Sequence, residues 1–135
     1  MDSIPNETIV DRILNTIPDA WAIYRFGSAG TLFERPDSDL DLALLAPNSL
    51  DQMVCWELAQ DLAALLKRDV DLVDLQRAST VLRHQIISYG QRIYCAHGFL
   101  AGEFESRALS DYVRLNESRR HILRDIQKRG RIHAG

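Results

Sequence analysis

The sequence predicts an α+β fold, with a small mixed β-sheet of about four strands packed by helices and a long C-terminal helix. Three observations support this fold class. Several segments carry apolar residues at helical spacing, and short apolar or β-branched runs of strand length alternate with them. The 135 residues, 46% of them hydrophobic, can close one core but not two ordinary ones. We therefore expect one domain, with residues 1–98 as its core and residues 99–135 as its helical extension.

The first half of the chain begins with a helix followed by two strands. After Pro5, apolar residues at helical spacing predict a helix, which Pro18 ends. Residues 20–26 are rich in aromatic and β-branched types, which predicts a strand that leads into a turn at residues 27–30. A second apolar run of strand length covers residues 40–46.

The middle of the chain continues the alternation of helix and strand. An apolar stripe over residues 50–67 predicts a helix, and residues 70–75 predict the third strand. Ser79 is placed to cap the start of a short helix. We expect that helix to end at Tyr89, because a glycine follows this residue directly. Residues 92–96 predict a further short strand.

The last segment is long, charged and periodic. Apolar residues spaced three, four or seven apart over residues 103–128 predict a final helix. At about 25 residues this helix would be roughly 38 Å long, which exceeds the width of so small a domain. Part of the helix is therefore expected to find its packing partner on another protein.

Charge and hydropathy narrow the classes of partner. The net charge of −3 conceals a basic tail over residues 119–135. Cations at the end of a helix suit its dipole, and no aromatic residues interleave them as they do in single-strand binders, so nucleic acid is an unlikely partner. No apolar run reaches the roughly 20 residues of a membrane span, so we expect no membrane contact and a cytoplasmic location.

The chemical signal of the chain is a pair of acids at the start of the second strand. Side chains at i and i+2 of a strand leave from the same face, so Asp39 and Asp41 are expected to project together. Two like charges on one face repel, and a divalent cation reverses the sign of their interaction. Mg²⁺ prefers hard oxygen ligands and is commonly held by one or two carboxylates plus substrate phosphates. The pair therefore predicts a magnesium site.

The turn before the acids supplies a second half to such a site. Gly27 lets backbone N–H groups approach a phosphate closely, and Ser28 adds an N–H and a hydroxyl. A third acid is expected in two-metal sites, and Asp71 and Asp74 on the third strand are the candidates. Asp71 is preferred because it lies inside an apolar run, where a solvated acid is least expected; Asp74 stays open as the alternative.

Gly27-Ser28, ten residues, then Asp39-x-Asp41 resembles the GS-x10-DxD signature of the minimal nucleotidyltransferases in the polymerase-beta-like superfamily. The chain looks most like the MntA-type antitoxins of HEPN/MNT toxin–antitoxin systems. The resemblance implies Mg²⁺-dependent transfer of AMP from ATP to a tyrosine of a HEPN ribonuclease toxin, in a hetero-oligomer with that toxin. It also implies that Gly27 and Ser28 bind the triphosphate, that Asp39, Asp41 and Asp71 hold the metal, and that Asp71 can deprotonate the acceptor hydroxyl.

Two other functions remain open. The chain could neutralise its partner by binding and occlusion alone, with a vestigial nucleotide site. It could instead modify a small molecule, although a chain of this length has little room for the acceptor-binding domain of larger relatives. The intact set of Gly27, Ser28 and three acids favours the enzyme, because clustered like charges without a metal are a standing cost.

Overall fold

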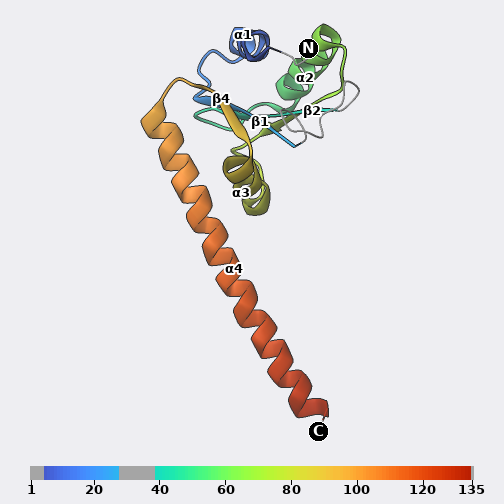
Figure 1. Ribbon diagram of the computed structural model, residues 1–135, viewed down its shortest axis with the longest axis vertical. Coiled ribbons are helices and arrows are strands. Elements are labelled where there is room, and N and C mark those ends of the chain that lie inside the picture. The colour runs from blue at the N-terminus through green and yellow to red at the C-terminus, as the bar shows by residue number, and fades with distance from the viewer. Residues whose placement is uncertain (1–4, 28–38, 135) are drawn as a thin grey trace.

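The computed structural model describes residues 5–27 and 39–134, and it confirms the predicted order of elements (Figure 1). Strand and helix bounds differ from the predicted ones by no more than two residues, except at the last helix. The elements are α1 (Asn6–Thr16), β1 (Ala22–Phe26), β2 (Leu40–Leu45), α2 (Gln52–Leu66), β3 (Val70–Asp74), α3 (Thr80–Tyr89), β4 (Gln91–Cys95) and α4 (Gly98–Ala134).

The four strands form one mixed sheet in the order β3-β2-β1-β4. β1 runs antiparallel to β2 and β4, whereas β2 and β3 are parallel. The C-terminal end of β1 therefore meets the N-terminal ends of the other three strands. We call this the acidic end of the sheet, because Asp39, Asp41 and Asp71 lie there.

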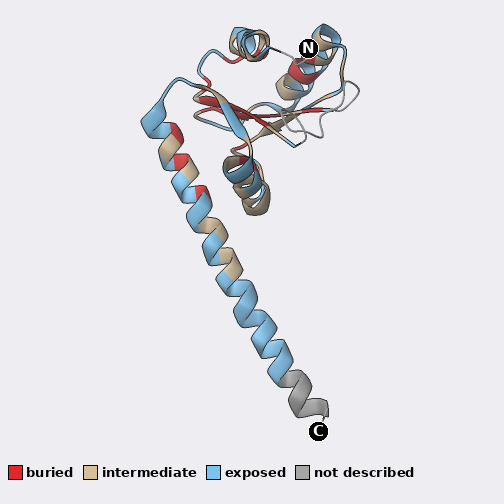
Figure 2. Ribbon diagram, viewed as in Figure 1, coloured by how far each residue is buried: buried red, intermediate tan, exposed pale blue. Residues whose placement is uncertain are grey.

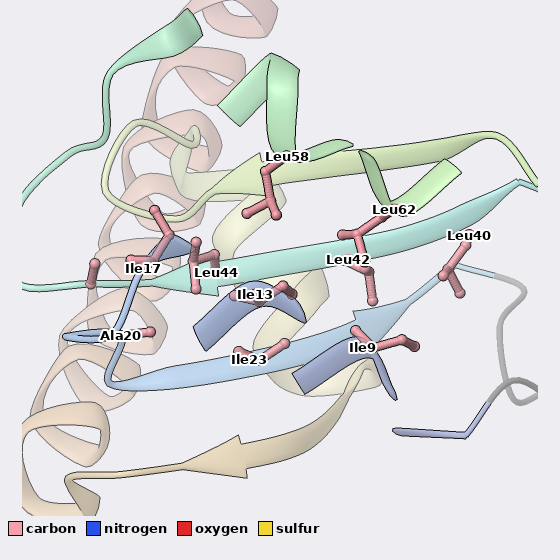
Figure 3. Packing of buried hydrophobic residues seen from close by; sticks show 11 residues of the cluster. Ile9, Ile13, Ile17, Ala20, Ile23, Leu40, Leu42, Leu44, Leu58 and Leu62 are labelled. Carbon is pink, nitrogen blue, oxygen red and sulfur yellow. The ribbon is translucent and has the colours of Figure 1, made fainter. Parts of the chain in front are cut away.

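Helices cover both faces of the sheet. Leu40, Leu42 and Leu44 of β2 point towards α1 and α2, where they join a buried cluster (Figure 3). The alternate residues Ala43 and Leu45 face a second cluster on the other side, to which α3 and the start of α4 contribute Ile86, Ala101 and Phe104. Burial on both faces explains why β2 reads as a continuous apolar run rather than as an alternating one.

The final helix is longer than predicted. α4 has 37 residues, about 55 Å at the usual rise, whereas the sequence predicted a helix over residues 103–128. No proline follows Pro47, so no residue in this segment breaks the helix. Ala101, Phe104 and Ala108 are buried, but every residue from 117 to 128 is exposed (Figure 2). The distal part of α4 thus projects away from the body, as Figure 1 shows.

Polar and aromatic contacts fix the proximal part of α4 against the body. The buried Tyr24 hydroxyl donates to Glu105 Oε2 at 2.6 Å, and Arg92 Nη1 lies 3.2 Å from the same oxygen. Two turns further on, Tyr112 stacks on His84 of α3, with ring centroids 3.6 Å apart. None of the described helices is long and apolar enough to cross a bilayer.

Candidate active site

The structure brings Asp39, Asp41 and Asp71 together at the acidic end. Asp41 is the second residue of β2, and its Cα partners are Phe26 in β1 and Asp71 in β3. Asp39 directly precedes β2. The next residue, Leu40, donates its backbone N–H to the carbonyl oxygen of Asp69, just before β3, at 2.8 Å. By alternation, Asp41 shares its face with Ala43 and Leu45, the face that α3 covers.

Asp41 lies at the centre of this group, where the neighbouring carboxylates repel it. Burial raises the pKa of the Asp41 carboxyl above its ordinary value of 3.8, and the negative charges of Asp71 and Asp39 raise it further. Asp41 is half-buried, whereas the other two carboxylates are exposed. In their present positions, no three acidic, imidazole or thiol side chains of the described residues are arranged to hold a metal ion. The group is nonetheless one to which a proton or a cation is attracted.

Gly27 closes the site on the β1 side. Its backbone has a φ of 72°, in the left-handed region that favours glycine. A Cβ at this position would overlap Asp41 Oδ2 and lie 3.1 Å from Asp41 Cγ. Only glycine therefore combines this turn with the observed position of the Asp41 carboxylate. Ser28, the second predicted phosphate-binding residue, lies outside the described residues.

Asp74 is committed to supporting the backbone. Its carboxylate accepts hydrogen bonds from Leu50 N at 2.7 Å and Gln76 N at 3.0 Å, and Arg77 Nε lies 3.7 Å away. These contacts hold the loop that precedes α2 against the end of β3. Asp71, by contrast, is exposed, although its position within an apolar run suggested that it would be buried. The strand register, rather than burial, places Asp71 beside Asp41.

The sequence pattern did not single out an aromatic residue near this site, but the structure places one there. Tyr89 ends α3 and is 81% exposed. The next residue, Gly90, packs closely on the end of β1, since a Cβ on it would lie 3.0 Å from Arg25 O and 3.3 Å from Phe26 Cβ. Tyr89 is therefore held at the acidic end. Its only local signal is a tyrosine before a glycine that ends a helix.

Comparisons with known proteins agree with this geometry. The model of the polymerase beta nucleotidyltransferase family matches residues 8–98. The protein adenylyltransferase MntA of Shewanella oneidensis is 37% identical over 128 residues, which cover 93% of this chain and 90% of that relative.

Solved structures extend the likeness to the whole fold. A toxin–antitoxin crystallised with AMP-PNP is 36% identical, with a TM-score of 0.82, and the match covers 92% of this chain and 99% of that one. A complex of tri-AMPylated Shewanella oneidensis HEPN toxin with MNT antitoxin is 35% identical, with a TM-score of 0.77 and coverage of 94% and 99%. The chain therefore belongs to the polymerase beta nucleotidyltransferase family, as an MntA-type member.

Proposed function

We propose that this chain is an antitoxin-type protein adenylyltransferase, which transfers AMP from ATP to a tyrosine hydroxyl of a cognate HEPN ribonuclease toxin and so neutralises it. The observation that carries the proposal is the position of Asp41, between the charges of Asp39 and Asp71 and against Gly27. The likeness over 93% of the chain to a relative named protein adenylyltransferase supports the same activity.

The donor set fits Mg²⁺ as the metal of this site. Asp39, Asp41 and Asp71 offer anionic oxygens, the ligand type that Mg²⁺ prefers, and their mutual repulsion favours a cation among them. When bound, Mg²⁺ would neutralise charge on the phosphate oxygens. Gly27 and Ser28 would bind the triphosphate through their backbone N–H groups. ATP is then substrate and Mg²⁺ the resident cofactor.

Asp71 is the group that we assign as general base. Its exposed carboxylate is open to a hydroxyl carried by another protein, while Asp41 beside it is half-buried. Asp71 would take the proton of the tyrosine hydroxyl, and the phenolic oxygen would attack the α-phosphorus of ATP. The bond from the α-phosphorus to the bridging oxygen breaks, and pyrophosphate leaves with its electron pair. The products are tyrosyl-AMP on the toxin and pyrophosphate.

The extension over residues 99–135 is the surface that we assign to the toxin. Every residue of α4 from 117 to 128 is exposed, and Ile122, Leu123 and Ile126 are all more than half exposed. Apolar residues that recur along one side of a helix are how helices dock into partner grooves. The toxin would then bring its own acceptor tyrosine to Asp71.

A labelling experiment tests the activity. The purified chain is incubated with Mg²⁺, ATP labelled at its α-phosphate and the HEPN protein encoded beside it. We expect label on the HEPN protein, and no label when Asp39→Ala is combined with Asp41→Ala. Asp19→Ala is the matched control, because Asp19 is an exposed acid before β1, at the opposite end of the sheet. A HEPN variant with its acceptor tyrosine changed to phenylalanine should also stay unlabelled.

The same samples distinguish neutralisation by adenylylation from neutralisation by binding and occlusion. The exposed helix α4 is the observation that favours occlusion. Ribonuclease activity of the toxin is measured after each incubation. If the Asp39 and Asp41 double variant neutralises the toxin as well as wild type does, occlusion replaces adenylylation. If the wild-type chain labels a small molecule of the extract and leaves the HEPN protein unlabelled, the acceptor is not a protein and the proposal fails.

A further inference from the structure

We propose that the exposed ring of Tyr89 is the platform on which the adenine base of the ATP substrate stacks. This inference rests on the proposed function, because it concerns the nucleotide that the acidic end would use. Tyr89 would bind the adenine base, and it would let the site distinguish ATP from a phosphate chain that carries no base.

Tyr89 is the last residue of α3. It therefore lies at the acidic end of the sheet and belongs to the helix that covers the Asp41 face. β1 separates Asp41 from the end of α3, since Phe26 pairs with Asp41 on one side and packs against Gly90 on the other. Adjacent strands are about 4.8 Å apart, so Tyr89 lies on the order of 10 Å from Asp41. This separation is comparable to the one between the α-phosphate and the base of a nucleotide. Phe26 and Asp41 share the face that α3 covers.

The ring of Tyr89 is supported from the side. His84 meets it in an edge-on arrangement, with centroids 6.1 Å apart and planes at 87°. His84 is in turn stacked on Tyr112 of α4, with an interplanar angle of 8°. The ring of Tyr89 thus has one aromatic neighbour, His84, while the residue stays 81% exposed. An aromatic ring held in this way loses little conformational freedom when a base stacks on it.

Polar groups at the same end of the sheet account for the phosphates but not for the base. Asp39, Asp41 and Asp71 can act on the phosphates only with a cation, and Gly27 belongs to the phosphate turn. A base offers a flat π-face, and stacking on an aromatic ring is the interaction that such a face makes with any exposed tyrosine. Tyr89 is the large hydrophobic residue at this end with the greatest exposure among the described residues.

Binding of AMP-PNP to the isolated chain tests the proposal, with calorimetry as the measurement and Mg²⁺ present. We expect Tyr89→Ala to weaken AMP-PNP binding about tenfold, within the range that base stacking contributes. Tyr89→Phe should bind as wild type does, because the ring face acts and the hydroxyl does not. Phe99→Ala is the matched control: Phe99 is 78% exposed, but it follows the end of β4 that pairs with Ala22, at the opposite end of the sheet.

Inorganic tripolyphosphate distinguishes base stacking from a general structural effect. It carries the phosphates of ATP without the base, so its affinity should be the same for wild type and Tyr89→Ala. In labelling assays, we expect a raised KM for ATP with kcat within about twofold of wild type, because the stack exists in both ground and transition states.

Three results would overturn the inference. Tyr89→Ala could bind AMP-PNP as tightly as wild type, it could lose tripolyphosphate affinity to the same degree, or it could raise only the KM for the acceptor protein. The last result would assign the ring to the acceptor. These failures differ from failure of the proposed function, in which the wild-type chain itself neither binds AMP-PNP nor labels the HEPN protein.

Discussion

Gly27 packs directly against the carboxylate of Asp41, in a left-handed backbone conformation with a φ of 72°. Gly27→Ala would place a methyl group on Asp41 Oδ2, and the left-handed conformation costs a residue with a side chain about 1–2 kcal/mol. We expect a lower melting temperature and a displaced Asp41. The initial rate of AMP transfer to the toxin should fall at least about tenfold, which corresponds to about 1.4 kcal/mol in the barrier.

Gly102→Ala is the glycine control for this experiment. Gly102 lies within α4, and beyond the nearby backbone of its own helix a Cβ there would meet nothing within 4 Å. Alanine in a helix interior is more stable than glycine by about 0.5–1 kcal/mol, so this variant should melt slightly higher and transfer AMP at the wild-type rate. Equal transfer rates for Gly27→Ala and wild type would show that the close approach to Asp41 has no catalytic consequence.

Asp41→Asn should stabilise the metal-free chain at neutral pH. Burial and the charges of Asp71 and Asp39 raise the pKa of Asp41 above 3.8 in the folded state, so the folded chain binds this proton more tightly than the unfolded chain. The stability of the wild type therefore falls as pH rises from about 3.8 through the raised pKa of the folded state. Asparagine carries no charge, so the variant does not lose this stability. In acid, where Asp41 is protonated, the two proteins should be similarly stable.

Thermal melts in a chelating buffer, from acid to neutral pH, measure this effect. Asp19→Asn controls for the loss of one negative charge far from the acidic end. Adding Mg²⁺ with AMP-PNP should raise the melting temperature of the wild type more than that of Asp41→Asn. If Asp41→Asn melts at a lower temperature than wild type at neutral pH without metal, repulsion at Asp41 does not destabilise the folded chain.

The hydrogen bond from Tyr24 to Glu105 should be the main polar contact that holds α4 to the sheet. Burial of the Tyr24 ring, together with the hydrogen bond to Glu105, raises the pKa of the phenol strongly. Glu105→Ala would leave the buried hydroxyl without its acceptor, which costs about 1–3 kcal/mol. A double-mutant cycle with Tyr24→Phe, measured by denaturant unfolding, should give a coupling energy of at least about 0.5 kcal/mol.

An exposed ion pair on the same helix provides the comparison. Arg107 and Glu103 are 4.0 Å apart and both exposed. Their cycle should give between about 0 and 1 kcal/mol, as surface pairs do. If the two cycles give the same coupling, the buried contact between Tyr24 and Glu105 does not fix α4.

Local signals were sufficient to predict the order of elements. Pro18 and Pro47 end apolar runs, and the spacing of apolar residues separates strands from helices. The choice between Asp71 and Asp74 was harder, because it depends on the register between β2 and β3. One of the amides that bind Asp74, that of Leu50, lies 24 residues away in sequence, so local patterns do not reveal that the Asp74 carboxylate is already engaged.

Long-range packing also explains what the sequence did not predict. The extent of α4 was underestimated because its apolar stripe fades, whereas each residue added to an existing helix gains one backbone hydrogen bond without a new nucleation cost. Tyr89 carries no motif, and its place at the acidic end depends on the fit of Gly90 against β1. Such a fit between distant segments leaves no periodic trace in the sequence.

Acidic residues on the exposed stripe of α4 should separate partner binding from folding. Ile122 and Ile126 are four residues apart, so they share one side of the helix, and both are exposed. Ile122→Asp combined with Ile126→Asp should change the stability of the isolated chain by no more than about 0.5 kcal/mol, because neither side chain packs on the body. The same change should weaken binding to the HEPN protein at least about tenfold, since it places charge in an apolar interface.

His121→Asp combined with Gln127→Asp is the matched control, because it adds the same two carboxylates to exposed positions on other sides of the same turns. Binding to immobilised HEPN protein and melting of the chain alone are measured for both pairs. The stripe is the docking surface if only the isoleucine pair loses the partner while both pairs melt as wild type does. If both pairs lose it equally, net charge governs the association; if neither does, the toxin docks elsewhere on the chain.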